Sequence, residues 1–170
     1  YVFVDDMLVV GDTEELTVEG MSLLEKEFEE RGVQWAPHKK RGPCRCIEFL
    51  GLLLANTPEH QGIALTRKRM DKMQAELREW TEREVELRAT GAEPRQVARL
   101  LGKLVFASQV VPGGRVYMQG MLSAFKGVTV DWRRGVVSGV GFSNQPLALG
   151  DPFWRDVEWW RDHLREQAFT

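Results

Sequence analysis

The first eleven residues, YVFVDDMLVVG, place two short apolar runs on either side of a pair of acids. The runs cover residues 2–4 and 7–10, are rich in β-branched side chains, and are each too short for a helix. Runs of this length and composition predict the two buried strands of a hairpin. The turn between the strands then carries Asp5 and Asp6.

A helical pattern follows the hairpin. Thr13 or Asp12 is placed to cap the helix, and glutamates in the first turn favour the positive end of its dipole. The apolar face of this helix consists of Leu16, Met21, Leu24 and Phe28. We predict that the helix ends at Arg31, with Gly32 as a left-handed cap residue.

Strand patterns resume after this helix. Residues 33–35 alternate apolar and polar side chains and predict a short strand, and a basic loop between two prolines comes next. Residues 44–54 are mostly apolar, with Phe49-Leu50-Gly51 at their centre. A turn at residues 56–58 would let residues 62–65 pair with this stretch as a second hairpin.

Helical periodicity dominates from residue 66 to residue 126. Thr66 is placed to cap a first helix whose apolar stripe is Met70, Met73, Leu77 and Trp80. A charged segment ends near Gly91, and Pro94 starts a second helix with the stripe Val97, Leu101, Leu104 and Val105. A third helix is predicted from Arg115, with Val116, Met121, Leu122 and Phe125 as its apolar residues.

The last third of the chain changes character twice. Residues 127–150 are rich in glycine with alternating apolar residues, which indicates irregular structure or a short ribbon. Asp151 at a cap and Pro152 at the first helical position then predict a final helix. One face of this helix would carry Phe153, Val157, Trp160 and Leu164. Several aromatic residues in one helix are typical of a core.

Composition adds few constraints. The chain has 170 residues, 43% of them hydrophobic, and a net charge of −2, so no global basic field indicates a nucleic-acid partner. Cys44 and Cys46 are too close for a structural zinc pair and are interpreted as reduced thiols of an intracellular protein, cytoplasmic or nuclear. The sequence has no apolar run of membrane-spanning length and no leader, and we expect an upstream portion because the chain opens inside a strand.

The acidic pair carries the candidate chemistry. Adjacent carboxylates repel each other, and Mg²⁺, which is bound through one or two carboxylates plus substrate phosphates, would neutralise them. Asp5 and Asp6 are also ordinary turn residues, and taken alone the pair favours that simpler interpretation.

The surrounding pattern shifts the balance. Phe3-Val4-Asp5-Asp6, inside an apolar hairpin that a helix follows, resembles the catalytic hairpin of reverse transcriptases, with Phe where Tyr is commoner. In that family a Gly-x₆-Lys spacing and then Phe-Leu-Gly follow, and here they match Gly32, Lys39 and residues 49–51. One departure is Ala36, where the family often has Asn.

The resemblance implies roles for these residues. Two Mg²⁺ or Mn²⁺ ions would be held by Asp5 as the principal ligand and by Asp6 as a more peripheral one, together with an upstream aspartate. Lys39 would protonate the pyrophosphate leaving group. Lys40 or Arg41 are alternatives to Lys39 in a loose loop. The second hairpin, whose first strand contains Phe49, Leu50 and Gly51, would correspond to the primer grip.

The resemblance extends to the helical part. Residues 100–108, LLGKLVFAS, resemble the thumb of retrotransposon enzymes of the DIRS class, and Trp159-Trp160 resembles the segment before their RNase H domain. The implied fold is α+β: a partial polymerase palm (residues 1–65), an all-helical thumb (66–126), and a connection segment ending in a Trp-rich helix (127–170). Candidate phosphate contacts in the thumb are Arg67, Lys68, Lys72, Arg95, Arg99 and Lys103.

Three interpretations of function follow. The first is the back half of an RNA-directed DNA polymerase, which uses dNTPs and a primer–template and is inactive without the upstream palm and fingers. A downstream RNase H domain is a candidate partner of this enzyme. The second is a non-catalytic, domesticated retroelement domain that binds nucleic acid or a protein. The third is a scaffold whose helices bind a partner and in which the acids merely form a turn. The alternative for the basic residues at the start of the first helix of the thumb is a solvated face with Asp71 and Glu76 as partners.

Overall fold

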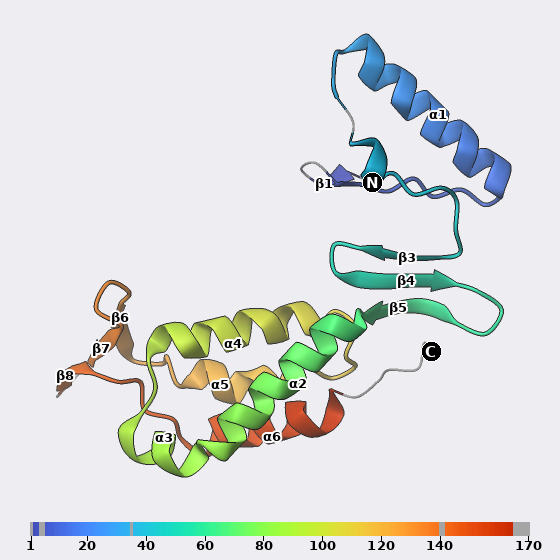
Figure 1. The fold of residues 1–170 in the computed structure, drawn as a ribbon. Helices are drawn as coiled ribbons and strands as arrows, with labels where there is room; N and C mark the ends of the chain where they lie inside the picture. The colour runs from blue at the N-terminus through green and yellow to red at the C-terminus, as the bar shows by residue number, and fades with distance from the viewer. Residues whose placement is uncertain (1, 4–5, 35, 140–141, 165–170) are drawn as a thin grey trace. The chain divides into compact units, whose positions relative to one another are not determined.

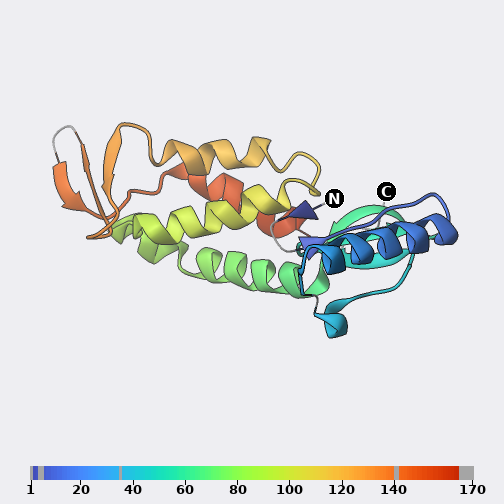
Figure 2. The same ribbon diagram turned by 90° about the horizontal axis from the view of Figure 1, so that it is seen from above.

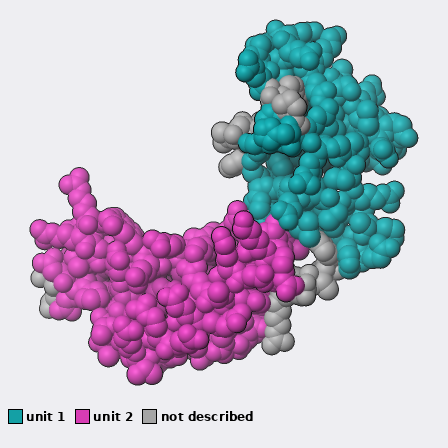
Figure 3. Space-filling view, viewed as in Figure 1, with its two compact units in different colours: residues 1–63, 169–170 teal, residues 64–168 magenta. Residues whose placement is uncertain are grey.

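The computed structural model describes residues 2–3, 6–34, 36–139 and 142–164. Within these residues the chain is a mixed α+β protein with six α-helices and three small sheets (Figure 1). It divides into two compact units, residues 1–63 with 169–170 and residues 64–168 (Figure 3). The predicted α+β class is therefore confirmed, while the assignment of palm, thumb and connection stays a prediction.

The predicted N-terminal hairpin exists but is short. Strand β1 (Val2–Phe3) pairs antiparallel with β2 (Asp6–Met7), with Val2 opposite Met7 and Phe3 opposite Asp6. The predicted second strand is too long, because residues 8–10 are not in a strand and Val10 is 71% exposed. The pairing that the structure describes therefore joins residues 2–3 to residues 6–7.

Helix α1 (Glu14–Glu30) follows the prediction closely. The side chain of Thr13 accepts a hydrogen bond from the backbone N–H of Leu16, and Arg31 is the C-terminal cap with Gly32 at a positive φ beyond it. Its less exposed positions recur with helical spacing, and Gly20 among them lies close to Val9. Leu16, predicted on the inner face, is instead 51% exposed.

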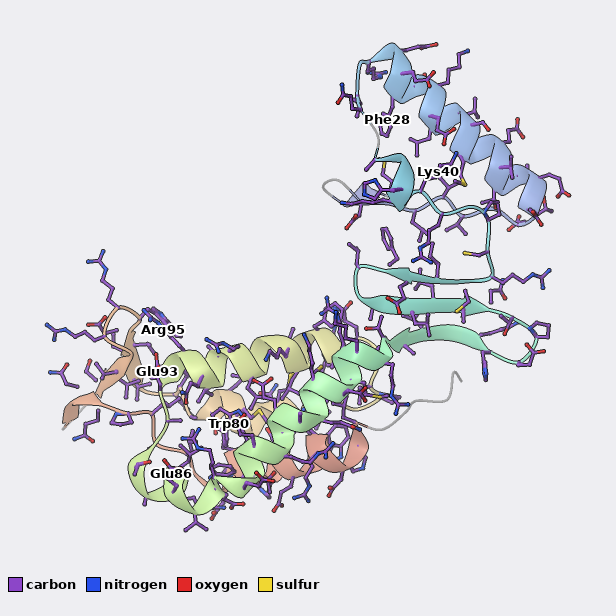
Figure 4. The ribbon with its side chains drawn as sticks, in the orientation of Figure 1. Phe28, Lys40, Trp80, Glu86, Glu93 and Arg95 are labelled. Atoms are coloured by element: carbon purple, nitrogen blue, oxygen red, sulfur yellow. The ribbon has the colours of Figure 1, made fainter. Side chains whose placement is uncertain are left out.

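The segment after α1 is not the predicted strand. Val33 and Gln34 have no strand partner, and Trp35 lies outside the described residues. The basic loop contains a 3-10 turn, η1 (Pro37–Lys39). An ion pair between Lys40 and Glu25 ties this loop to α1, and Figure 4 labels Lys40 beneath the helix.

A three-stranded sheet follows, in the order β3 (Cys46–Phe49), β4 (Leu52–Asn56) and β5 (Gln61–Leu65). Phe49 pairs with Leu52, so Leu50 and Gly51 form a two-residue turn in which both φ angles are positive. Such a turn matches the twist of two antiparallel strands. The apolar stretch predicted as one strand is therefore itself a hairpin, and β5 adds to its second strand.

The helical part begins with α2 (Arg67–Glu82), α3 (Glu84–Thr90) and α4 (Pro94–Ala107). Thr66 precedes α2 but makes no side-chain cap bond. The predicted α2 stripe is buried in full, whereas in α4 Val105 is 54% exposed and Leu100 and Ala107 are buried instead. Gly91 ends α3 at a positive φ, and Ala92 forms an isolated bridge with Leu147.

The predicted third helix is wrong as a continuous element. The chain forms a 3-10 turn, η2 (Val116–Met118), and then the short α5 (Gln119–Ser123), with non-helical angles at Tyr117. Met121 is fully buried, but Val116 is 67% exposed and Leu122 49% exposed. The pattern therefore marks the right region, and of the four predicted residues Met121 and Phe125 face the core while Val116 and Leu122 do not.

Residues 127–164 share the core of the helices before them. Strands β6 (Val128–Asp131), β7 (Val136–Gly139) and β8 (Phe142–Gln145) form an antiparallel sheet, as the short-ribbon interpretation predicts and a purely helical tail does not. Helix α6 (Asp151–His163) packs on α2 and α5, with Gly150 as its cap rather than Asp151. Phe153, Val157, Trp160 and Leu164 are buried, as predicted.

Candidate functional site

The acidic hairpin presents one describable carboxylate. Asp6 lies in β2 opposite Phe3 and is exposed to solvent. Asp5, the principal predicted ligand, lies outside the described residues. The described geometry thus places Asp6 next to the bend of the hairpin, and the role of Asp5 and Asp6 stays a prediction.

A metal site needs more than Asp6. Among the described residues, no group of three or more His, Cys, Asp or Glu side chains converges in a way that would hold a cation. One or two carboxylates fit Mg²⁺ only when phosphate oxygens or further carboxylates complete its octahedron. The described residues alone therefore do not form a metal site.

Lys39 is not brought against the acidic hairpin. It is the last residue of η1 and is exposed. Turn η1 and strand β1 overlap in Figure 1, but Figure 2, drawn at right angles, separates them. Lys40, the alternative to Lys39, is held by its ion pair with Glu25. A role for Lys39 at the leaving group would therefore require a rearrangement of this loop.

The predicted primer-grip residues sit at a hairpin tip. Phe49 ends β3, and Leu50 and Gly51 make the turn into β4, with Leu50 at a φ of 50° and Gly51 at 80°. A leucine at positive φ is uncommon and costs free energy, because its Cβ crowds the backbone. Leu50 is also 36% exposed. The turn therefore presents an apolar side chain to solvent on a constrained backbone.

The six predicted phosphate contacts fall into two groups. Arg67 pairs with Asp71 on α2, and Lys103 of α4 pairs with Glu76 of α2. Asp71 and Glu76 are the two partners that the solvated-face interpretation expects. The second group consists of Lys68, Lys72, Arg95 and Arg99, which are exposed and form no ion pair with another described residue.

Two contacts show how the basic residues align. Lys103 reaches Glu76, and the guanidinium carbon of Arg69 lies 4.5 Å from the centre of the Phe106 ring. Helices α2 and α4 are therefore antiparallel neighbours, and residues three, four or seven apart share one face. We call the line along which α2 and α4 meet, marked by these two contacts, the seam. Lys72 falls between Arg69 and Glu76 on the seam, and Arg99 lies one turn from Lys103.

Sequence reasoning missed several basic residues of this unit. Arg69 was passed over as a contact, although it shares the seam with Lys72. Arg133 and Arg134 are exposed in the loop between β6 and β7, and Arg95 is near enough to act on Asp131 in that loop. The sequence does contain a signal for this loop, because residues 131–135 read Asp-Trp-Arg-Arg-Gly, a charged segment that ends in glycine. The alternating apolar residues on either side predict a ribbon and draw attention away from these charges.

Charge is divided unevenly between the two units. Residues 64–168 contain 17 lysines and arginines against 13 aspartates and glutamates, and residues 1–63 contain 6 against 12. The nearly neutral total therefore conceals a basic unit and an acidic one. A net positive unit with a basic seam is suited to a phosphate backbone.

Comparisons with known proteins add no family. No protein-family model matches the chain, and neither a curated protein nor a solved structure matches it. In the part of the chain that the structure describes, no helix is both long enough and apolar enough to cross a membrane.

Proposed function

We propose that this chain is the C-terminal part of a reverse-transcriptase palm with its thumb and connection segment. In the complete protein it would take part in template-directed transfer of nucleotides from dNTPs to a primer. The observation that carries the proposal is the order of elements. A hairpin with Asp6 beside its bend is followed by a capped helix, a Phe-Leu-Gly hairpin and a basic helical unit.

The acidic hairpin would supply the reaction centre. Asp5 and Asp6 would hold Mg²⁺ or Mn²⁺ ions, which stabilise the attacking and leaving oxygens in this class of reaction. Since the described residues do not complete a cation site, the proposal requires at least one further carboxylate from an upstream palm segment. We therefore expect this polypeptide alone to be inactive.

The protein's other residues would position the nucleic acid. The turn at Leu50 and Gly51 would contact the primer strand, because it presents backbone and an apolar side chain on a rigid hairpin tip. The exposed residues Lys68, Lys72, Arg95 and Arg99 would contact phosphates, which fixes the position of a duplex without reading its sequence. Lys39 would act on the leaving group only after its loop moves.

Primer extension by the protein joined to its upstream segment tests the proposal. Asp5→Asn and Asp6→Asn remove one carboxylate each, and we expect Asp5→Asn to reduce extension at least about 100-fold, as loss of preorganised charge stabilisation does. Asp12→Asn is the matched control, since Asp12 is an exposed acid just beyond the hairpin. Full extension by Asp5→Asn would refute the catalytic assignment.

A non-catalytic nucleic-acid-binding domain is the second candidate. The observation that favours it is that residues 64–168 build their own hydrophobic core and carry the net positive charge. Such a unit can bind nucleic acid whether or not the acids are active. Nucleic-acid binding that depends on Lys72 and Arg99, with no extension under any condition, would select this function over the polymerase.

A further inference from the structure

The side chain of Asp131 holds the loop between β6 and β7 in its conformation. Asp131 pairs with Val136, so residues 132–135 form the loop. The Asp131 carboxylate accepts hydrogen bonds from the backbone N–H groups of Arg133, at 2.9 Å, and Arg134, at 3.1 Å. The N–H of Gly135 donates to the Asp131 carbonyl at 2.9 Å. The loop backbone is therefore held in place from within.

The start of α4 supports the loop from the other side. The Glu93 side chain lies against Gly135, where a Cβ would be 2.9 Å from its carboxylate oxygen, and the φ of 71° at Gly135 favours glycine. The two backbone hydrogen bonds, and after them the positive charges of Arg134 and Arg95, lower the pKa of the Asp131 carboxyl. Figure 4 shows Glu93 and Arg95 at the end of α4 that meets these strands. The loop thus adjoins Arg95 of the basic helices.

The loop presents an indole among guanidinium groups. Trp132 is 49% exposed, and it is the one exposed tryptophan among those that the structure describes. Arg133 and Arg134 follow it and are exposed as well, with Arg134 3.8 Å from Asp131. Exposed aromatic rings beside basic groups are the means by which proteins hold single-stranded nucleic acid.

We propose that this loop, residues 132–135, binds an unpaired stretch of nucleic acid. Trp132 stacks on a base, and Arg95 and Arg133 contact the phosphates on either side. A base is the favoured ligand for the ring because an indole offers no charge, whereas an acidic polypeptide would engage the arginines alone. The inference rests on the proposed function in one respect, that residues 64–168 bind nucleic acid; it adds an unpaired strand and a site.

The test is binding of fluorescein-labelled oligonucleotides to the full chain, measured by anisotropy over a salt series. The probes are a single strand of twelve thymidines and a duplex of the same length. We expect Trp132→Ala to weaken single-strand binding roughly tenfold, since base stacking on an aromatic ring is worth about that much, and to leave duplex binding within twofold. Trp132→Phe keeps a stacking ring and should restore most of the affinity.

Charge reversal gives an independent measure. Arg133→Glu should lower the slope of log affinity against log salt by about 0.7, the value for one phosphate contact on a single strand. Arg78→Glu is the matched control, because Arg78 is exposed on α2 next to Gln74, whose side chain contacts Leu164 and so faces α6. This control should change neither the slope nor the preference for single strands.

The outcomes separate the two proposals. If Trp132→Ala and Arg133→Glu bind like the wild type while Lys72→Glu and Arg99→Glu bind weakly, the loop proposal is wrong and nucleic-acid binding by the helices stands. If the wild type binds neither probe, both are overturned. If polyglutamate competes for the loop and Trp132→Ala leaves this competition unchanged, the site is one for acidic polypeptides and the stacking proposal fails.

Discussion

Asp156 is the side chain whose replacement should disturb the helical unit most specifically. It lies on α6, is 7% exposed, and accepts a hydrogen bond from the backbone N–H of Met121 at 3.1 Å. The N–H of Gly120 donates to the same carboxylate. One side chain of α6 therefore satisfies the free backbone donors at the start of α5, 35 residues earlier in the chain.

Replacing Asp156 with alanine leaves those donors without an acceptor in a buried interface. An unsatisfied buried donor costs about 1–3 kcal/mol, and loss of a helix-capping side chain about 0.5–2 kcal/mol. Removal of a desolvated carboxylate offsets part of this cost, so we expect a net loss of about 2 kcal/mol. For a unit of this size that lowers the midpoint of thermal unfolding by roughly 10 °C.

Tryptophan fluorescence is the appropriate assay, because five of the six tryptophans lie in residues 64–168. Asp156→Asn is the matched control, since it keeps one oxygen acceptor and removes the charge; we expect it within about 1 kcal/mol of the wild type at pH 7. The explanation would be refuted if alanine cost less than about 0.5 kcal/mol, or if alanine and asparagine cost the same.

The pH dependence of Asp156 provides a second check. Burial raises the pKa of this carboxyl above its ordinary value of 3.8, and the two backbone hydrogen bonds only partly oppose the effect. The folded protein then binds the proton more tightly than the unfolded chain does. Stability of the wild type relative to Asp156→Asn should therefore rise as the pH falls through the raised pKa toward 3.8. A difference that does not change with pH would contradict this account.

Two further predictions concern backbone and surface charge. A Cβ at Gly91 would lie 2.8 Å from the Leu147 carbonyl oxygen, and Gly91 has a φ of 74°, so Gly91→Ala should lower the free energy of unfolding in urea by about 1–3 kcal/mol. Gly102→Ala is the control in open space within α4 and should raise it by about 0.5–1 kcal/mol, so equal effects would exclude the steric cause. Lys40→Gln removes the ion pair with Glu25 and should lower the protection of α1 amides from hydrogen exchange by less than about 1 kcal/mol at low salt, and by nothing measurable at 1 M salt. Lys26→Gln is the control with a more exposed pair and should have less effect, and losses that do not depend on salt would contradict this account.

Local signals carried the sequence-based predictions that succeeded. Helix α1 is specified by its own residues: Thr13 caps it, Gly32 follows its end, and apolar side chains recur every turn. Helix α2 is specified in the same way by the stripe from Met70 to Trp80. In these segments the information lies within one or two turns of the chain, so a single sequence suffices.

The predictions that failed depended on distant contacts. The segment from Arg115 has helical spacing, but η2 and α5 form because Asp156 and Pro152 of α6 lie against Gly120, where a Cβ would be 2.0 Å from the Pro152 carbonyl oxygen. The turn at Leu50 was missed because a leucine seldom adopts positive φ, and only Gly51 beside it signalled a turn. For the candidate site, the sequence singled out the acids and the basic residues and offered Asp71 and Glu76 as ion-pair partners. It could not show that Arg67 and Lys103 are the residues these two acids pair with.

Burial separates the two units more sharply than any motif does. Residues 64–168 bury a continuous core that runs from Met70 to Leu164, whereas none of the described side chains in residues 1–63 is buried. Apolar burial is the main term that offsets the conformational entropy lost on folding, so a unit without it depends on further contacts for its order. An isolated regulatory or binding domain would be expected to complete its own core. If residues 1–63 are the proposed palm fragment, their strands and helix would contribute one side of a core that the proposed upstream segment would close, and the same segment would bring the carboxylate that Asp5 and Asp6 lack.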